Sequence, residues 1–279
     1  PPSLRESADA PLLLYALGRS ELLQRPNLAI VGSRSATPHG LATAQEFARH
    51  LSERGLTIVS GLALGIDAAA HQGALPHPGS TIAVVGTGLD LCYPQRHLAL
   101  AQRISEKGLL LSEYPLGMPA LRDHFPQRNR VIAGLCAGTL VIEAPVGSGS
   151  LITARLALES GREVFAVPGR IVSEASFGCL DLIRDGATLI RNVDDVLGTL
   201  GPLANPVQRT PNESIHRPAE LQLSDQQRMI LNLVTTEPIP VDDVMRSAGI
   251  EASRVLSTLT ILEMKRLIRR VPGNFVQRY

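Results

Sequence analysis

Short apolar segments recur between residue 27 and about residue 190, and helical patterns lie between them. The segments are rich in Val, Ile and Leu and lack polar alternation, which is typical of strands buried on both faces of a sheet. They read NLAIVG, LTIVSG, TIAVVG, GLLLSE, GTLVIEA, EVFAVPG and GATLI. The helical patterns at residues 38–54 and 150–160 end at Gly55 and Gly161, since glycine commonly stops a helix. The pattern predicts an α/β fold with a Rossmann-like, doubly wound, mostly parallel sheet.

The composition changes near residue 200, which predicts a second domain. Residues 201–219 are rich in proline and lack apolar periodicity, as a linker would. Residues 220–279 predict three helices and two short strands, the layout of a small winged-helix domain. We therefore expect a leader at residues 1–26, a Rossmann-like domain at 27–200, the linker and the winged helix. The chain begins with Pro1 instead of methionine, so we expect that upstream residues have been removed.

Charge and cysteine content limit the possible partners. The 279 residues include 27 Lys and Arg against 26 Asp and Glu, which argues against binding DNA through net charge alone. Any anion site must therefore be local. No apolar run approaches the roughly 18 residues that span a bilayer, and the start has no signal-peptide pattern, so we expect a cytoplasmic protein. Cys92, Cys136 and Cys179 lie far apart, which favours free buried thiols over a disulfide or a metal site.

Four loops that follow predicted strands carry glycine and hydroxyl residues. Ligands of doubly wound sheets bind beyond the carboxyl ends of the strands, where glycine lets backbone N–H groups approach an anion. Neither GxGxxG nor GxxxxGK[ST] occurs, so a standard nucleotide fingerprint is absent. Several phosphate-sized loops along one sheet edge favour a polynucleotide strand. The candidate residues are Gly32, Ser33, Arg34, Ser60, Gly61, Gly65, Gly86, Gly88, Gly147, Ser148, Gly149 and Ser150.

A basic cluster, Arg128, Asn129 and Arg130, lies where a helical pattern begins at the same predicted edge. Helix starts favour acids, so two guanidinium groups there suggest an anionic ligand. At least one of them is expected to face a backbone phosphate, together with Arg34. The alternative is that Arg128 or Arg130 pairs with a carboxylate at a neighbouring strand end. The two candidates for that carboxylate are Glu113 and Glu143.

Two aromatic residues and one acid–histidine pair complete the candidates. Tyr93 and Phe125 lie in loops near the predicted edge, where they either stack on bases or simply pack. Asp67 and His71 are four residues apart on a helix, a spacing that suits a metal or an acid–base pair but more often a local hydrogen bond. We find no clustered acids, GxSxG or cysteine–base pair. The sequence therefore predicts no enzyme activity, no metal and no cofactor.

Seven of these stretches together resemble the DNA-processing protein A family, also called DprA or Smf. They cover about residues 10–195 in the order that the family has them. The stretches are VGSR at 31, SGLALGIDAAAH at 60, TIAVVGTGLDLCYP at 81, SEYPLG at 112, FPQRNRVIAGL at 125, EAPVGSGSLITA at 143 and VPG at 167.

The resemblance implies an extended Rossmann fold, binding of single-stranded DNA, a homodimer, and loading of RecA recombinase onto DNA coated by single-strand binding protein during natural transformation. It implies that the loop from Gly32 to Arg34 and the loop from Ser148 to Ser150 form the DNA pocket. The family often has Lys directly after YP, where this chain has Gln95, so Arg96 is expected to take the basic role. An N-terminal helical domain common in the family is expected to be absent from this chain.

Two other classes of protein stay open. The fold is also similar to that of phosphoribohydrolases that bind a nucleoside monophosphate over a PGGxGT loop and use a Glu, for which Glu143 is a candidate. GLCAGTLVIEA lacks the paired glycines of that loop. The third class is a protein-interaction scaffold in which the loops are only tight turns.

The winged helix is expected to contribute little to DNA affinity. Its candidate recognition helix, residues 251–265, contains two acidic and two basic residues, which sum to zero. A basic cluster follows and either contacts a phosphate backbone or serves solubility or a protein partner. It consists of Lys265, Arg266, Arg269 and Arg270.

Overall fold

The computed structural model describes residues 1–5, 7, 9–201, 224–235, 238–264, 267–271 and 273–278. The chain forms two compact units, Pro1–Gln208 and Arg209–Tyr279, each with its own core. The predicted linker at residues 201–219 lies outside the described residues from 202 onward. In the part of the chain that is described, no helix has the length and apolar character needed to cross a bilayer.

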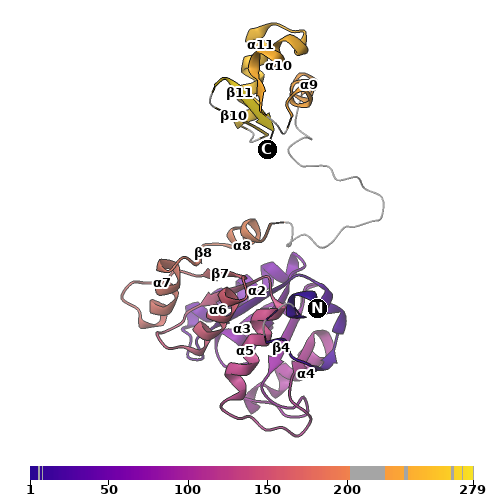
Figure 1. Cartoon of the computed structure of the whole chain (residues 1–279). Helices are drawn as coiled ribbons and strands as arrows, with labels where there is room; N and C mark the ends of the chain where they lie inside the picture. The colour runs from indigo at the N-terminus through magenta and orange to yellow at the C-terminus, as the bar shows by residue number, and fades with distance from the viewer. Residues whose placement is uncertain are drawn as a thin grey trace. The chain divides into compact units, whose positions relative to one another are not determined.

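The first unit is built on a sheet with helices around it (Figure 1). The sheet has eight strands in the order β1-β5-β4-β3-β2-β6-β7-β8. All neighbouring strands are parallel except β1 and β5. The chain builds outward from β2 to β5 and then returns to add β6 on the other side of β2. The strands are β1 (Tyr15–Gly18), β2 (Asn27–Gly32), β3 (Thr57–Ser60), β4 (Thr81–Val85), β5 (Leu109–Ser112), β6 (Gly138–Ile142), β7 (Glu163–Ala166) and β8 (Thr188–Leu189).

Helices cover both faces of this sheet, which confirms the predicted α/β, Rossmann-like, doubly wound, mostly parallel architecture. Alternate residues of one strand enter different cores: Ala29 and Val31 face α5 and α6, whereas Leu28 and Ile30 face α2 and α3. The helices are α1 (Pro2–Arg5), α2 (Pro38–Glu53), α3 (Ile66–Ala74), α4 (Leu98–Lys107), α5 (His124–Leu135), α6 (Gly149–Glu159), α7 (Phe177–Arg184) and α8 (Val193–Leu200), with short 3-10 turns η1 (Ser20–Gln24), η2 (Gln95–His97) and η3 (Glu174–Ser176).

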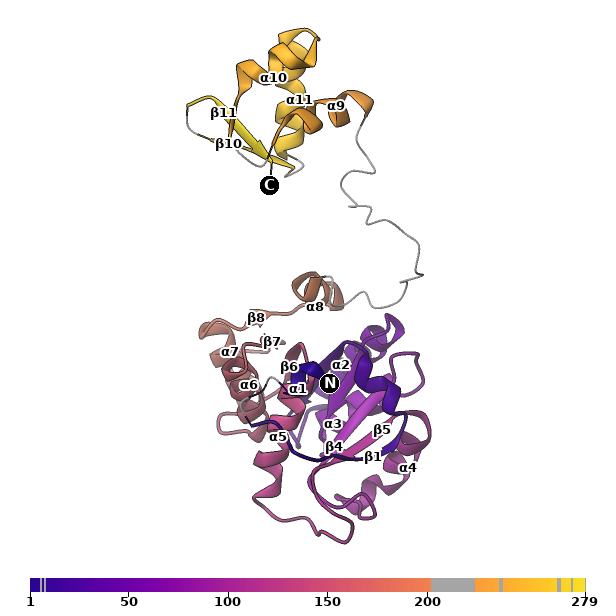
Figure 2. The ribbon, with the colours of Figure 1, turned by 45° about the vertical axis from the view of Figure 1, so that its right-hand side comes forward.

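The first 26 residues, which the sequence sets apart as a leader, contribute directly to this unit. Tyr15–Gly18 pairs antiparallel with β5 at the edge of the sheet, where β1 and β5 lie side by side in Figure 2. Leu22 is fully buried, and Leu4 belongs to the core cluster under α5. The hydrophobic pattern does not reveal β1 because three of its four residues are exposed and backbone pairing holds it.

The second unit has the winged-helix layout that the sequence predicts. Ser224 caps α9 in a capping box with Gln227, and the buried residues of the three helices pack on Ile268 and Val276 of the terminal hairpin. A short strand, β9, adds a third member to the sheet, in the order β10-β11-β9. The elements are α9 (Asp225–Leu233), β9 (Ile239–Pro240), α10 (Val241–Ala248), α11 (Ala252–Met264), β10 (Ile268–Val271) and β11 (Phe275–Arg278).

The three cysteines are free thiols, as predicted. Cys136 and Cys179 are buried, and burial raises the pKa of Cys179 to about 11. Cys92 is only half-buried.

Candidate functional site

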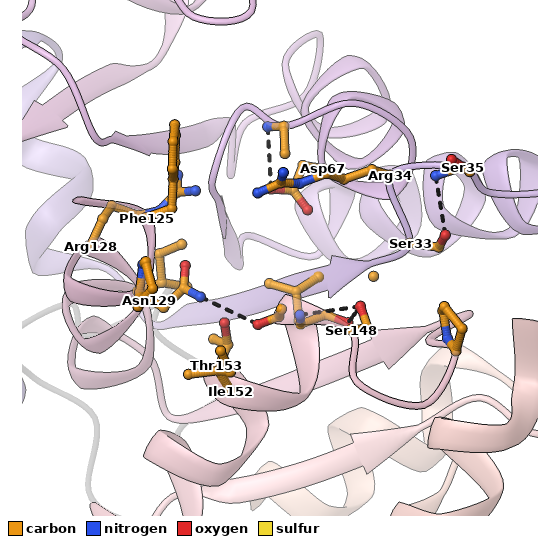
Figure 3. Close-up of a pocket in the computed structure, with 18 of the residues that line it drawn as sticks. Ser33, Arg34, Ser35, Asp67, Phe125, Arg128, Asn129, Ser148, Ile152 and Thr153 are labelled. Atoms are coloured by element: carbon orange, nitrogen blue, oxygen red, sulfur yellow. Dashed lines mark hydrogen bonds between the residues drawn. The ribbon is translucent and has the colours of Figure 1, made fainter. Parts of the chain in front are cut away.

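A cavity of about 570 Å³ opens where β2 and β6 end (Figure 3). The chain leaves β2 for one face of the sheet and β6 for the other, which is the switch point where doubly wound sheets bind ligands. The described residues that line it are Val31, Gly32, Ser33, Arg34, Ser35, Ala63, Asp67, Arg122, Phe125, Pro126, Arg128, Asn129, Ile132, Pro145, Ser148, Gly149, Ser150, Ile152 and Thr153.

The cavity brings together half of the candidate residues. These are Gly32, Ser33, Arg34, Phe125, Arg128, Asn129, Ser148, Gly149 and Ser150. The others lie outside its lining: Ser60, Gly61, Gly65, Gly86, Gly88, Tyr93, Arg96, Arg130 and Gly147. Strand order explains part of this separation, because the loop after β4 is two strands away from β2. Two of the four loops, those after β2 and β6, therefore form one local cavity, and the candidates in the loops after β3 and β4 lie outside its lining. The loops do not form an even row of phosphate sites.

Sequence reasoning missed three polar lining residues, Ser35, Arg122 and Thr153. Arg122 is the most consequential because it is an exposed cation in the loop before α5. The sequence does contain a sign of its role, because Arg122 precedes the basic cluster at Arg128 by only six positions. Arg122 lies in the loop before α5, where the helix-start pattern that marks Arg128 and Arg130 does not extend.

The hydroxyl groups of the two cavity loops shape their own backbone. Ser148 is the N-cap of α6, and its Oγ accepts a hydrogen bond from the Ser150 N–H at 3.4 Å. Ser33 Oγ accepts from the Ser35 N–H at 3.1 Å. Asn129 Nδ2 donates to the Gly149 carbonyl at 3.3 Å, which ties α5 to the start of α6. The positive end of the α6 dipole therefore opens into the cavity.

Arg130 has the ion pair that the sequence left open as an alternative to phosphate. Its Nη2 donates to both carboxylate oxygens of Glu113, at 2.6 and 2.7 Å, and Nη1 donates to the Asp9 carbonyl. Both members of the pair are 25% exposed, and Arg130 lies outside the cavity. The ion-pair alternative is therefore present in the structure, and a phosphate contact of Arg130 stays a prediction.

Arg128 contacts neither of the carboxylates expected as its alternative partners. Only 5% of it is exposed, and its Nη1 donates to the carbonyls of Gly61 and Val84. Burial lowers its pKa to about 10, against which the charge of Asp67 acts. Arg128 thus forms part of the cavity floor, where a buried carboxylate balances its charge.

Asp67 and His71 form local hydrogen bonds, which confirms the structural interpretation of their spacing. Asp67 Oδ2 accepts from the N–H groups of Gly61 and Ala63, at 3.0 and 3.3 Å. His71 Nε2 accepts from the Leu62 N–H at 3.2 Å and shares a 2.7 Å hydrogen bond with Thr81 through Nδ1. The described residues contain no cluster of three side chains able to hold a metal ion.

Phe125 links the exposed cation of the cavity to the neighbouring loop. The Arg34 guanidinium carbon lies 5.7 Å from the centre of the Phe125 ring, and the side chain extends from the end of β2 toward that ring. The ring of Tyr93 also lies near Phe125, with the two ring centroids 5.4 Å apart and the ring planes inclined by 41°. Tyr93 is 51% exposed, so an aromatic surface continues outward from the cavity.

Glu143 has a capping role at the end of β6. Its oxygens accept from the backbone N–H of Thr37 at 2.8 Å and from the Thr37 hydroxyl at 2.5 Å, at the N-terminus of α2. Glu143 is not among the residues that line the cavity.

The fold and this site define a Rossmann-like protein with a cationic cavity at the switch point and a winged-helix unit. The chain belongs to the DNA-processing protein A family, DprA or Smf. The family model described as DNA recombination-mediator protein A matches residues 1–201, and that of the DprA winged helix domain matches residues 215–274.

Relatives from several bacteria resemble most of the chain. Protein Smf of Escherichia coli K12 is 41% identical over 278 residues, 99% of this chain and 74% of the relative. The structure of DNA processing protein A from Streptococcus pneumoniae superposes with a TM-score of 0.69 at 49% identity, covering 71% of this chain and 70% of that one. The Helicobacter pylori protein, whose structure gave insight into its single-stranded DNA binding mode, has a TM-score of 0.66 at 34% identity and covers 72% and 92%.

Proposed function

We propose that this protein binds single-stranded DNA in the cavity at the ends of β2 and β6, without catalysing a reaction on it. Family membership and the single-stranded DNA binding mode of the H. pylori relative support the proposal. It extends to helping RecA recombinase load onto incoming DNA during natural transformation, as the resemblance implies.

The observation that carries the proposal is the charge of the cavity. Among the described residues that line it, Arg34, Arg122 and Arg128 oppose the single carboxylate of Asp67, a formal balance of three minus one, or +2. Because Asp67 and Arg128 are both buried, the excess charge belongs to the exposed Arg34 and Arg122. Two exposed guanidinium groups beside the α6 N-terminus suit backbone phosphates. Phe125 and Tyr93 offer ring faces to unpaired bases, which a duplex does not present.

A titration of fluorescent oligo-dT at several salt concentrations tests the proposal. If four to six phosphates are neutralised, the logarithm of the association constant falls with the logarithm of salt at about −0.7 per phosphate. Matched duplex is expected to bind more weakly, and mixed-sequence single strands to bind about as well as oligo-dT. An affinity that does not change with salt contradicts the proposal.

The expected protein partners need their own experiments. We propose that the protein forms a homodimer and acts on RecA and on DNA coated by single-strand binding protein. Exposed apolar side chains support a protein-binding surface, since Ile171 is 81% and Val172 77% exposed. Light scattering gives the oligomeric state, and the rate of RecA filament formation on coated DNA, with and without this protein, tests loading.

The phosphoribohydrolase alternative has less support than DNA binding. An enzyme of that kind needs its carboxylate at the substrate, whereas Glu143 is hydrogen-bonded to Thr37. Incubation with AMP and with DNA, followed by product analysis, tests for catalysis. Turnover that Glu143→Gln abolishes would support the enzyme and contradict our proposal.

A further inference from the structure

The floor of the cavity contains a buried pair of opposite charges, Asp67 and Arg128. We propose that these two residues are a positioning pair: they hold the loop at residues 61–66, and this loop holds Ser33 and Arg34 where they contact DNA. The inference rests on the proposed function, because it assigns to this pair the placement of Arg34 at the same site.

Both backbone polar groups of Gly61 are bound by the pair. Its N–H donates to Asp67 Oδ2 at 3.0 Å, and its carbonyl accepts from Arg128 Nη1. The Ala63 N–H donates to the same carboxylate oxygen at 3.3 Å, and Arg128 also binds the Val84 carbonyl at the end of β4. The pair therefore determines where the loop leaves β3 and ties that loop to the next strand.

The loop in turn contacts the residues on either side of the Ser33–Arg34 peptide bond. The Ile66 N–H donates to the Ser33 carbonyl at 3.2 Å. Gly65 has a φ of +75°, and a Cβ placed there would meet the Ser33 carbonyl oxygen and come within 2.9 Å of the Arg34 carbonyl. The Ser33 N–H is held on its other side by the Glu143 carbonyl, at 2.6 Å. A shift of residues 61–66 therefore displaces the backbone that carries the Arg34 side chain.

Burial and charge argue against Arg128 as a phosphate ligand. Arg128 is 5% and Asp67 6% exposed, and Nη1 of Arg128 is already bound to two carbonyls. Burial raises the pKa of Asp67, while the positive charge of Arg128 acts against that rise. Arg128 Nε is buried and has no hydrogen-bond partner among the described residues, so a direct contact with DNA is the alternative that the experiment must separate.

The isosteric variant Asp67→Asn distinguishes a positioning role from a purely electrostatic role, because the two roles predict opposite changes in oligo-dT affinity. If charge alone mattered, removal of a negative charge from the cavity would strengthen the binding of oligo-dT. A positioning pair predicts the opposite, a dissociation constant at least fivefold higher, because the amide no longer balances Arg128 and the loop loses its geometry. Equal or tighter binding by Asp67→Asn overturns the inference.

Coupling to Arg34 is the second test. Arg128→Met is expected to weaken oligo-dT binding at least fivefold in the wild-type background and less than twofold in the Arg34→Ala background, because its effect passes through Arg34. If Arg128 instead contacts a phosphate independently, Arg128→Met weakens binding by the same factor in both backgrounds. The salt slope of the double variant is then smaller in magnitude than that of Arg34→Ala by about 0.7. That result overturns the inference.

The controls separate positioning from loss of fold. Melting temperatures are measured for every variant, and titrations are done well below the lowest of them. The double variant Asp67→Asn with Arg128→Met removes both buried charges, so it is expected to melt above Asp67→Asn and still to bind weakly. Wild-type affinity in the double variant overturns the inference even if the single variant does not fold. Arg162→Met is the matched control, because Arg162 is half-buried, donates to the Ser3 carbonyl at 3.0 Å and precedes β7.

The two proposals fail in different ways. If Arg34→Ala binds oligo-dT as the wild type does, the cavity is not the DNA site, and the proposal that DNA binds at the ends of β2 and β6 is wrong. If Arg34→Ala binds weakly but Asp67→Asn binds more tightly, the DNA site stands and only the positioning role is overturned.

Discussion

Arg34 is an exposed cation of the cavity, and we expect DNA binding there to depend most directly on it. Its side chain approaches the ring of Phe125, while the carbonyl of the preceding residue, Ser33, accepts a hydrogen bond from the Ile66 N–H. Because contact with the ring limits the conformations of the side chain, we expect it to lose less entropy on binding than a free arginine would.

We expect Arg34→Ala to weaken oligo-dT binding by about 1.5–3 kcal/mol, the value of a charge-assisted hydrogen bond. The melting temperature is expected to change little, because the side chain is exposed. Arg34→Lys should restore only part of the affinity, since an ammonium group cannot make the bidentate contact. Fluorescence titration and thermal unfolding measure the two effects. Normal binding by Arg34→Ala would show that the site is elsewhere.

His71 gives the fold a dependence on pH. Burial lowers its pKa to about 3, and His97 and Arg128 act in the same direction. At pH values between about 3 and the ordinary histidine pKa of about 6.5, His71 binds a proton in the unfolded chain but not in the folded chain. The free energy of unfolding therefore falls as the pH falls through that window, by about 2 kcal/mol from this residue at pH 5.

Denaturant unfolding at pH 7 and pH 5 measures this contribution, with His71→Gln as the control. Asp67 acts in the opposite direction because burial raises its pKa, so only the difference between wild type and His71→Gln isolates His71. The variant is expected to lose less stability on acidification than the wild type. Equal losses in the two proteins would contradict a neutral buried histidine.

At the scale of elements, α5 provides two arginines with different surroundings. Arg128, in the second turn, faces the loops after β3 and β4. Arg130, two residues later, faces Glu113 just beyond β5 and the Asp9 carbonyl. Successive helical residues turn by about 100°, so a separation of two residues places the side chains on opposite sides. The helix thus contacts the cavity floor on one side and the N-terminal segment on the other.

Arg130→Met is expected to lower the free energy of unfolding by about 1–3 kcal/mol, between the values of exposed and buried ion pairs. The reason is that Glu113 would be left half-buried without its partner. Oligo-dT affinity should stay within about twofold of wild type, because Arg130 lies outside the cavity. Denaturant unfolding and titration test both statements. Weaker binding at unchanged stability would restore the phosphate interpretation.

At the scale of the whole molecule, the DNA-binding charge is expected to lie in the first unit. In the second unit, Arg270 pairs with Glu263 at 3.2 Å and Arg269 donates to Gln277, so two members of the basic cluster are already engaged. Lys265 and Arg266 lie outside the described residues. Residues 251–265 carry no net charge, so a broad electrostatic surface for DNA is lacking there.

Deletion of residues 205–279 is therefore expected to reduce oligo-dT affinity by less than about tenfold, or about 1.4 kcal/mol. The shortened and full-length proteins are compared by the same titration, after circular dichroism has established that the shortened protein is folded. A larger loss would make the winged helix a second DNA-binding module. RecA loading measured with both proteins then tests whether the second unit serves a protein partner.

The sequence by itself determined the order of elements and the loops that build the site. Buried parallel strands need continuous apolar residues, and loops that approach a ligand need glycine and hydroxyl residues, so both leave local signals around Ile30 and Val141 and at Gly32 and Ser148. The motifs also identified the family. The helices α2 and α6 begin and end within a residue of their predicted bounds because their caps are local.

Only the tertiary structure decided which partners the charged side chains take. Arg128 binds carbonyls that are 67 and 44 residues away in the chain, and Arg130 meets a carboxylate 17 residues away, so no local pattern separates the two arginines. The strand β1 was also hidden, because its place depends on backbone hydrogen bonds to β5 and not on its side chains. Long-range contacts of this kind depend on how the layers pack, and packing is a property of the folded chain as a whole.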